Sequence, residues 1–117
     1  MKIYVAGPYG AQEWEKAEHD VCRTVHHNVR EAIEVGIALI EKGHTPFIPH
    51  LSHFIQMEME YPLPPAYWYS LDKEWLAVCD ALFYMGSSYG ADAELELAKE
   101  LGLKVFTTLD EVSKGDT

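Results

Sequence analysis

Residues 81–107 read ALFYMGSSYGADAELELAKELGLKVFT, and this stretch decides the fold class. It begins with an apolar run from Ala81 to Met85, which has the length and composition of a buried parallel strand. A turn-rich loop then leads into a predicted helix from Ala91 to Leu101, which Gly102 ends. A second strand is predicted at Lys104 to Thr107. Strand, helix and strand in this order predict a parallel sheet.

The N-terminal half of the chain follows the same alternation. Ile3 to Ala6 is a short apolar run closed by the turn Gly7–Gly10, which predicts a first strand. A proline-free stretch from about Trp14 to Lys42 predicts an amphipathic helix that Gly43 ends. Its polar beginning, Glu13 to Thr24, is expected to be a separate helical turn or a flexible lead-in. The stripe expected to face the core consists of Val25, Val29, Ala32, Ile33, Gly36, Ile37 and Ile40.

The middle of the chain is rich in proline and aromatic residues. Thr45 to Ile48 predicts a second strand, and Pro49 to Pro65 predicts a long functional loop with one helical turn near Phe54 to Glu58. Tyr67 to Val78 predicts a helix, and the tail after the last strand is expected to be short and polar. The residues of this helix expected to face inward are Trp68, Leu71, Trp75 and Leu76.

We therefore predict an α/β fold, a Rossmann-like three-layer sandwich with a mostly parallel sheet of four to five strands. A single domain is expected to cover residues 1–117. In such sheets ligands bind at the carboxyl ends of the strands. Three loops are expected to converge there: Gly7–Gly10, Pro49–Pro65 and Gly86–Asp92.

The amino-acid composition excludes some classes of binding partner. The formal net charge of −10, with nine scattered basic residues, argues against a nucleic acid polymer as ligand. No run approaches the roughly 20 apolar residues of a membrane span, and the N-terminus is too short for a signal peptide. Cys22 and Cys79 form no CxxC motif. Two reduced, buried thiols favour a cytoplasmic location.

Glu94 is the acid whose position best suits chemistry. The loop before it follows a buried strand and opens a helix, where free N–H groups and the helix dipole attract anions. With the helix starting at Ala91, Glu94 lies in the first turn and is expected to stay ionised, which suits a nucleophile. On spacing alone, a plain first-turn acid explains Glu94 better than catalysis does.

Asp72 is the second candidate. It lies inside a predicted helix, where aspartate is a poor helix former, and it flanks the inward face of Trp68 and Trp75. A carboxyl group beside aromatic rings has a raised pKa and suits a general acid. A solvated helical acid explains the residue equally well.

His50 and His53 have the HxxH spacing of some metal ligands. No third ligand in a known pattern accompanies them, so we expect no metal and assign this segment, with Phe47, to the lining of a ligand pocket. The turn Gly7–Gly10 is too short for a Walker loop and lacks the GxGxxG spacing. It indicates only that some group approaches the backbone closely at the end of the first strand.

Four segments occur in order along the chain: IYVAGP at 3–8, GHTPFIPH at 43–50, DKEWL with CDA at 72–81, and Ser88-x-Gly90-x-x-x-Glu94 with Ala98. Together they resemble the nucleoside 2-deoxyribosyltransferase superfamily, from Met1 to about Val112. The resemblance is strongest to its small DUF4406-type branch and to the nucleoside 5′-monophosphate N-glycosidases.

This resemblance implies double displacement at the anomeric carbon of a nucleoside or nucleotide. Glu94 would form a glycosyl-enzyme ester, Tyr4 would hydrogen-bond and orient Glu94, and Asp72 would protonate or hold the departing base. Attack by water then gives hydrolysis, and attack by a second base gives transfer; the motif does not separate the two. No cofactor is implied.

Ser88 bears on the substrate. In relatives that use free nucleosides the residue two before the glycine is often acidic, whereas the monophosphate N-glycosidases have serine there, so Ser88 favours a 5′-monophosphate. The Pro8-Tyr9-Gly10 turn departs from the phosphate-binding relatives, and Arg23 or Arg30 would have to supply a cation. The residues expected to bind substrate are Gly7, Tyr9, Phe47, His50, His53, Ser88 and Gly90.

Relatives build the pocket partly from a neighbouring subunit, which implies a homodimer or larger assembly. The apolar loop around Met57, Met59 and Tyr61 is expected to serve as its interface. Two other interpretations stay open. One is a non-catalytic nucleotide-binding or sensing module, and the other is a Rossmann-like domain whose acids are surface features.

Overall fold

The computed structural model describes residues 1–10 and 18–115, and for residues 18–22 only the backbone. Among these residues no helix is both long and apolar enough to cross a membrane. The elements follow one another as β1 (Lys2–Ala6), α1 (Glu18–Glu41), β2 (Thr45–Phe47), the short 3₁₀ helix η1 (Pro49–Leu51), α2 (Ser52–Glu58), α3 (Pro65–Leu76), β3 (Ala81–Tyr84), α4 (Tyr89–Glu100), β4 (Lys104–Phe106) and the 3₁₀ helix η2 (Leu109–Glu111).

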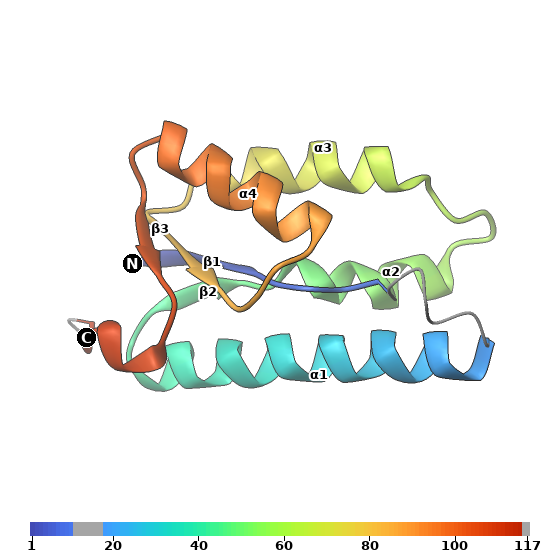
Figure 1. The fold of residues 1–117 in the computed structure, drawn as a ribbon, viewed down its shortest axis with the longest axis horizontal. Helices are drawn as coiled ribbons and strands as arrows, with labels where there is room; N and C mark the ends of the chain where they lie inside the picture. Colours follow the sequence, from blue (N-terminus) through green and yellow to red (C-terminus); the bar gives the residue numbers. More distant parts are fainter. Residues whose placement is uncertain (11–17, 116–117) are drawn as a thin grey trace.

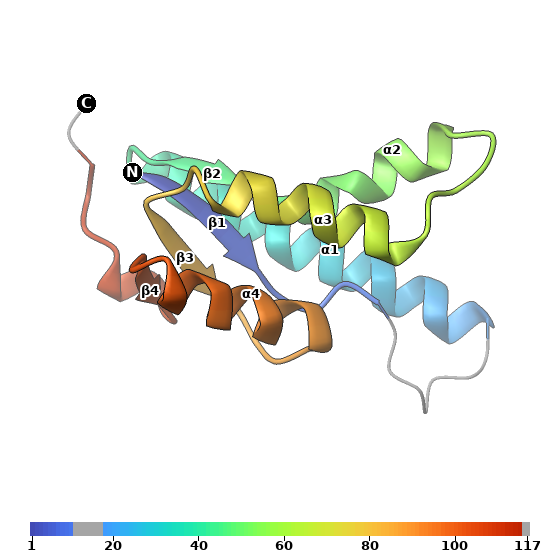
Figure 2. The ribbon, with the colours of Figure 1, turned by 90° about the horizontal axis from the view of Figure 1, so that it is seen from above.

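The four strands form one parallel sheet in the order β2-β1-β3-β4. Helix α1 lies on one face of this sheet, and α3 and α4 lie on the other (Figures 1 and 2). The predicted three-layer α/β sandwich with a parallel sheet is therefore confirmed, with four strands. Helix α2 extends beyond the carboxyl end of β1 rather than covering a face of the sheet (Figure 2).

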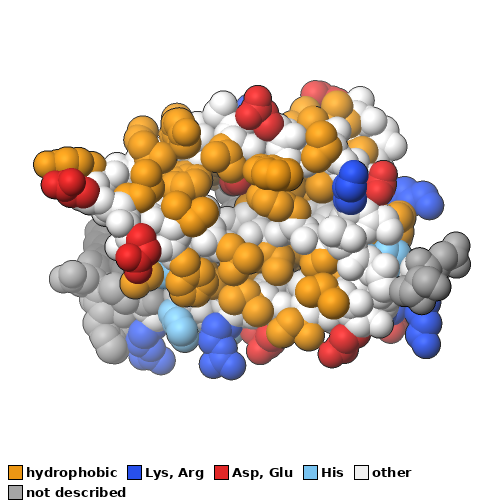
Figure 3. All heavy atoms as spheres, turned by 180° about the vertical axis from the view of Figure 1, so that it is seen from behind, with side chains coloured by type: hydrophobic (Ala, Val, Ile, Leu, Met, Phe, Trp, Pro, Cys, Tyr) orange, Lys and Arg blue, Asp and Glu red, His pale blue; other side chains and the backbone are white. Residues whose placement is uncertain are grey.

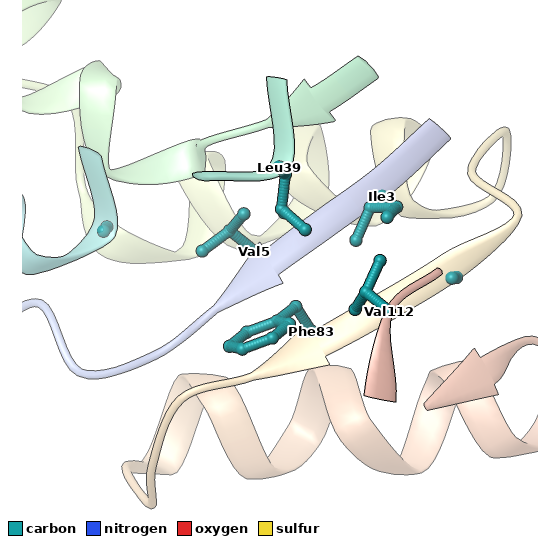
Figure 4. Close-up of a cluster of buried hydrophobic side chains, with 7 residues drawn as sticks. Ile3, Val5, Leu39, Phe83 and Val112 are labelled. Carbon is teal, nitrogen blue, oxygen red and sulfur yellow. The ribbon is translucent and has the colours of Figure 1, made fainter. Parts of the chain in front are cut away.

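The strands divide the core into two clusters because successive side chains point to opposite faces. Ile3, Val5 and Phe83 face α1 and pack with Leu39 and Val112 (Figure 4). On the other face Tyr4, Ala6 and Leu82 pack with Leu76 of α3 and Ala98 of α4. Cys79 is buried in this second cluster, as predicted for a core thiol. Because β1 and β3 are buried on both faces, the central residues of both strands are all apolar.

The predicted core stripe of α1 is partly wrong. The buried positions are Val29, Ala32, Gly36 and Leu39, whereas Ile37 and Ile40 are 49% and 58% exposed. The buried set has the regular 3-4-3 spacing, and each exposed isoleucine follows a buried residue by one, which turns it about 100° around the helix. The helix is also continuous over 18–24, so no separate turn occurs there; residues 13–17 lie outside the described part.

The segment predicted as a long loop, 49–65, is largely helical. Pro49 begins η1, where its fixed φ suits a first helical position, and α2 continues the chain to Glu58. Helix α3 likewise begins at a proline, Pro65, two residues before the predicted start. Only residues 59–64 connect the two helices. These helices are short and largely exposed, so hydrophobic periodicity gives little sign of them.

The tail after β4, predicted to be short and polar, contains the 3₁₀ helix η2. Thr108 and Glu111 form a capping box around η2, and Val112 behind it is only 1% exposed within the α1-side core. The Lys42 Nζ donates hydrogen bonds of 2.9 Å to the carbonyls of Leu109 and Val112. Two apolar residues, Leu109 and Val112, together with these hydrogen bonds therefore dock the otherwise polar tail on the α1 side of the core.

Candidate active site

A cavity of about 450 Å³ opens at the carboxyl ends of the strands. Its walls come from the loop after β1, from η1 and α2, from α3 with the segment before it, and from the start of α4. This volume is typical of small-molecule sites. The predicted site residues that line it are Gly7, Tyr9, His50, Asp72, Ser88, Gly90 and Glu94.

Glu94 lies against Tyr4, which is fully buried in β1 and whose hydroxyl donates a hydrogen bond to Glu94 Oε2. Burial raises the pKa of Glu94 to about 7; the Tyr4 hydrogen bond acts in the opposite direction, and the negative charge of Asp72 raises the pKa further. The same burial, with the charges of both acids, raises the pKa of Tyr4, so its hydroxyl remains a proton donor.

The position predicted for Glu94 in the helix is wrong. The Ser88 side chain accepts the Ala91 N–H at 3.0 Å and caps α4, so the helix begins at Tyr89. The acid in its first turn is Asp92, and Glu94 lies in the second turn. Because the helix-dipole effect falls off within the first turn, burial decides the pKa of Glu94, which is raised and not held low as the predicted position in the first turn implied.

Asp72 is half-buried on α3, and burial raises its pKa to about 6. This is the direction predicted from its aromatic neighbours. Since the charge of Asp72 raises the pKa of Glu94, the two carboxyl groups titrate as an interacting pair. Such a pair can hold one proton between two carboxyl groups near neutral pH, which is a property of acid–base sites.

Two residues predicted to bind substrate, Phe47 and His53, are not among the described residues that line the cavity. Phe47 is opposite Tyr4 in the sheet register, and its ring lies 5.5 Å from the Tyr4 ring and stacks on Trp75 at 5.1 Å. It therefore supports Tyr4 from behind. His53 shares a 2.8 Å hydrogen bond between its Nδ1 and the Tyr9 hydroxyl, so it contacts the cavity wall from outside.

His50 anchors the loop after β1. It is only 3% exposed, and its Nε2 lies 3.2 Å from the Gly7 carbonyl and 3.0 Å from the Pro8 carbonyl. Carbonyl oxygens only accept hydrogen bonds, so Nε2 carries the proton. Burial lowers the pKa of His50, which keeps the ring neutral. Asn28 of α1 donates to the Tyr9 carbonyl at 3.1 Å, which fixes the far end of the loop.

The two glycines of the predicted site make room for the protein's own side chains. A Cβ on Gly7 would lie 2.9 Å from the Cβ of Met85, and one on Gly90 would lie 3.3 Å from Cε1 of Tyr69. The close approach predicted at the end of β1 is therefore that of the loop after β3.

Three aromatic residues of the wall were not predicted as site residues: Trp68, Tyr69 and Tyr89. Trp68 was assigned to the core. Its spacing of four from Asp72 places both on one face of α3 and could have identified it. Tyr69 and Tyr89 are exposed at the rim, with ring centroids 6.4 Å apart. For Tyr69 we find no signal in the sequence.

The wall carries acids without basic partners. Among the described residues no lysine or arginine lines the cavity, and the two arginines considered as phosphate ligands, Arg23 and Arg30, are exposed on α1 away from it. The described part of the chain also contains no cluster of three or more histidine, cysteine, aspartate or glutamate side chains placed to hold a metal ion.

Residues 1–109 match the family described as domain of unknown function (DUF1937), and the chain belongs to this family. The DUF4406-type branch expected from the motifs is not confirmed. A comparison with curated proteins gives no match. Among solved structures the chain is similar to a 2-deoxyribosyltransferase from the psychrotolerant bacterium Bacillus psychrosaccharolyticus, with a TM-score of 0.61 and 22% identity over 99% of this chain and 93% of that one. The two proteins share their fold.

The raised pKa of Glu94 makes stability depend on pH. An acid whose pKa is higher in the folded than in the unfolded chain lowers the free energy of unfolding as pH rises from about 4.5 through about 7. Glu94→Gln removes this loss, so at pH 8 the variant should be more stable than the wild type by about 1–3 kcal/mol, with little difference at pH 4. Urea unfolding between pH 4 and 8 measures this.

The matched control is Glu96→Gln, which changes an exposed glutamate of the same helix that pairs only with Lys99 at 3.5 Å. Its pH dependence should equal that of the wild type. Equal slopes for Glu94→Gln and the wild type would mean that Glu94 is not buried in solution.

Proposed function

We propose that this protein cleaves the N-glycosidic bond of a nucleoside by double displacement, with Glu94 as nucleophile. The observation that carries the proposal is the hydrogen bond from the buried Tyr4 hydroxyl to Glu94 in the cavity wall, with Asp72 close enough to raise the pKa of Glu94. The fold shared with a 2-deoxyribosyltransferase supports this choice over other reactions of carboxyl pairs.

In the first step a Glu94 oxygen attacks C1′ of the sugar while the C1′–N bond breaks. The bonding electrons leave with the base, which takes a proton from Asp72, and a glycosyl ester of Glu94 results. In the second step water, or a nitrogen of another base, attacks C1′ and gives its proton to Asp72, and the Glu94 carboxylate leaves. The configuration at C1′ is retained, and the products are the free sugar or a new nucleoside.

The protonation states follow from this scheme. The reactive form has one proton on the pair, on Asp72, with Glu94 ionised and accepting from Tyr4. With pKa values of about 6 for Asp72 and about 7 for Glu94, the singly protonated pair is most abundant between these values. Because the pKa of Glu94 is the higher of the two, the form with the proton on Asp72 is the minor arrangement of this pair, and its amount follows the same pH dependence. The rate should therefore follow a bell-shaped pH profile centred between about 6 and 7.

The charge of the cavity supports an uncharged nucleoside over the 5′-monophosphate that Ser88 favours in sequence. Two carboxyl groups line the cavity, and within the described chain no lysine or arginine does. The Ser88 hydroxyl already accepts the Ala91 N–H, although it still has a proton to donate to a sugar hydroxyl. Phosphate would enter an electronegative cavity without a counter-charge.

We further propose that residues 1–117 form one domain and that two copies associate. Seen from the side of α2 and β2, hydrophobic side chains cover much of the surface (Figure 3). On and after α2, Ile55, Met57 and Tyr61 are 56%, 68% and 78% exposed, whereas Met59, also assigned to the interface, is half-buried. An apolar area of this kind marks an interaction surface.

Sedimentation velocity measures the association. The wild type should sediment as a dimer or larger species, and Met57→Glu should shift it toward the monomer because a charge then has to be buried in the interface. A wild type that is monomeric at the highest concentrations would exclude this assembly.

Base release tests the proposed reaction. Ribo- and deoxyribonucleosides and their 5′-monophosphates are incubated with the protein, with and without a second free base, and products are separated by chromatography. We expect release or exchange of a base, faster from nucleosides than from monophosphates, and a loss of at least about 10³-fold in Glu94→Ala. Glu96→Gln is the control and should retain the wild-type rate.

Two results would contradict the proposal. An inert wild type would exclude catalysis, and saturable nucleotide binding without turnover would favour a non-catalytic binding module. Equal rates in the wild type and Glu94→Ala would remove Glu94 from the mechanism.

The role of Asp72 is tested by comparing two substrates whose leaving groups differ in their need for a proton. Asp72→Asn should slow base release from nucleosides by about 10²–10⁴-fold, because the departing base is no longer protonated. Hydrolysis of a 4-nitrophenyl glycoside of the same sugar should change far less, since nitrophenolate leaves without a proton. An equal loss on both substrates would mean that Asp72 positions Glu94 or the sugar instead.

A further inference from the structure

The indole of Trp68 has an unused hydrogen-bond donor next to the cavity. Trp68 lines the cavity, and its Nε1 is buried without a partner among the described residues. Buried indole N–H groups usually have a partner, because burial removes the water that would otherwise accept from them. Since Nε1 itself is closed to solvent, a ligand in the cavity can accept from it once the indole turns toward the cavity, and an acceptor on the ligand would favour that turn.

The position of Trp68 on α3 indicates which part of a ligand its indole would contact. Trp68 precedes Asp72 by four residues on the same helix, so the two side chains are neighbours on one helical face, and both line the cavity. In the proposed reaction Asp72 gives its proton to the departing base. A donor one helical turn from Asp72 therefore lies on the side of the base rather than on the side of the sugar.

A second buried polar atom without a partner is a hydrogen-bond acceptor. The Nδ1 of His50, also in the cavity wall, is buried without a partner in the described part of the chain. Because Nε2 carries the proton toward the Gly7 and Pro8 carbonyls, Nδ1 is an acceptor. Two residues of the wall, on different elements and among aromatic neighbours, thus carry one unpaired donor and one unpaired acceptor just below its surface. A nucleobase presents both acceptors and donors on a flat ring that fits such walls.

We propose that Trp68 is a specificity-determining residue whose indole N–H donates a hydrogen bond to a ring nitrogen or ring carbonyl of the base. This inference rests on the proposed function, since it takes the ligand to be a nucleoside. The hydrogen bond selects substrates by their base and strengthens as negative charge develops on the base during departure.

The first experiment observes the indole N–H directly. The chain has three tryptophans, so ¹⁵N-labelled Glu94→Gln protein, which does not consume substrate, gives three indole resonances to assign by substitution. During titration with inosine, adenosine, thymidine and cytidine, the Trp68 resonance should move saturably downfield with at least one of them. Trp75 lies on the same helix outside the cavity and should move less.

The second experiment compares leaving groups. Trp68→Phe keeps an aromatic ring and removes the N–H, so kcat/KM for the preferred nucleoside should fall by about 5- to 30-fold. For the 4-nitrophenyl glycoside, which has no ring nitrogen or ring carbonyl, it should stay near the wild-type value. A change in this ratio is not expected from a purely structural role, which would affect both substrates equally.

The outcomes separate the two proposals. If nucleosides move backbone amide resonances of the cavity but not the Trp68 indole, the inference is wrong and the proposed function stands. Equal losses on both substrates in Trp68→Phe would likewise overturn it. A shifted Trp68 resonance in a wild type without turnover supports base recognition and removes catalysis. If no nucleoside moves any resonance and no base is released, both proposals fall.

Discussion

The hydrogen bond from Tyr4 to Glu94 is the contact on which the arrangement of the site depends. It joins the central strand β1 to α4 across the core, and Tyr4 itself is fully buried. A buried carboxyl group without a hydrogen bond would be costly, so this bond keeps Glu94 in the wall of the cavity. The stack of Phe47 and Trp75 behind Tyr4 fixes the ring from the other side. The sheet register and the helix together set the position of one oxygen atom.

The order of strands and helices could be predicted because a strand that is buried on both faces has a continuous apolar sequence. The runs Ile3–Ala6 in β1 and Ala81–Tyr84 in β3 contain no charged residue, and Gly43 and Gly102, with positive φ, end the helices before β2 and β4. The residues at which helices begin were harder to predict from the sequence. The hydroxyl of Ser88 caps α4 two residues earlier than hydrophobic periodicity suggested, and this moved Glu94 from the first turn to the second. A cap is a local contact that periodicity does not report.

The site was predictable to the extent that it lies on loops at the strand ends. His50 and Ser88 line the cavity as expected. Phe47 does not, because its ring follows the alternation of β2 and lies under α3 beside Tyr4. The sequence predicts Trp68 on the inward face of its helix, whereas the residue lines the cavity together with Asp72. Which way a large aromatic points depends on what packs against it, and a single sequence does not contain that partner.

One physical cause unites the electrostatics of the cavity. Burial raises the pKa of Glu94, Asp72 and Tyr4 and lowers that of His50, so each of these groups is pushed toward its neutral form. The same loss of solvation acts on any charge that a ligand brings in, and the described wall supplies no cation to offset it. Among the described residues of the wall, neutral hydrogen-bonding groups are therefore the means of recognition. For the proposed reaction, this supports an uncharged sugar and base over a phosphate, and it gives the neutral groups of the wall more weight than charged side chains.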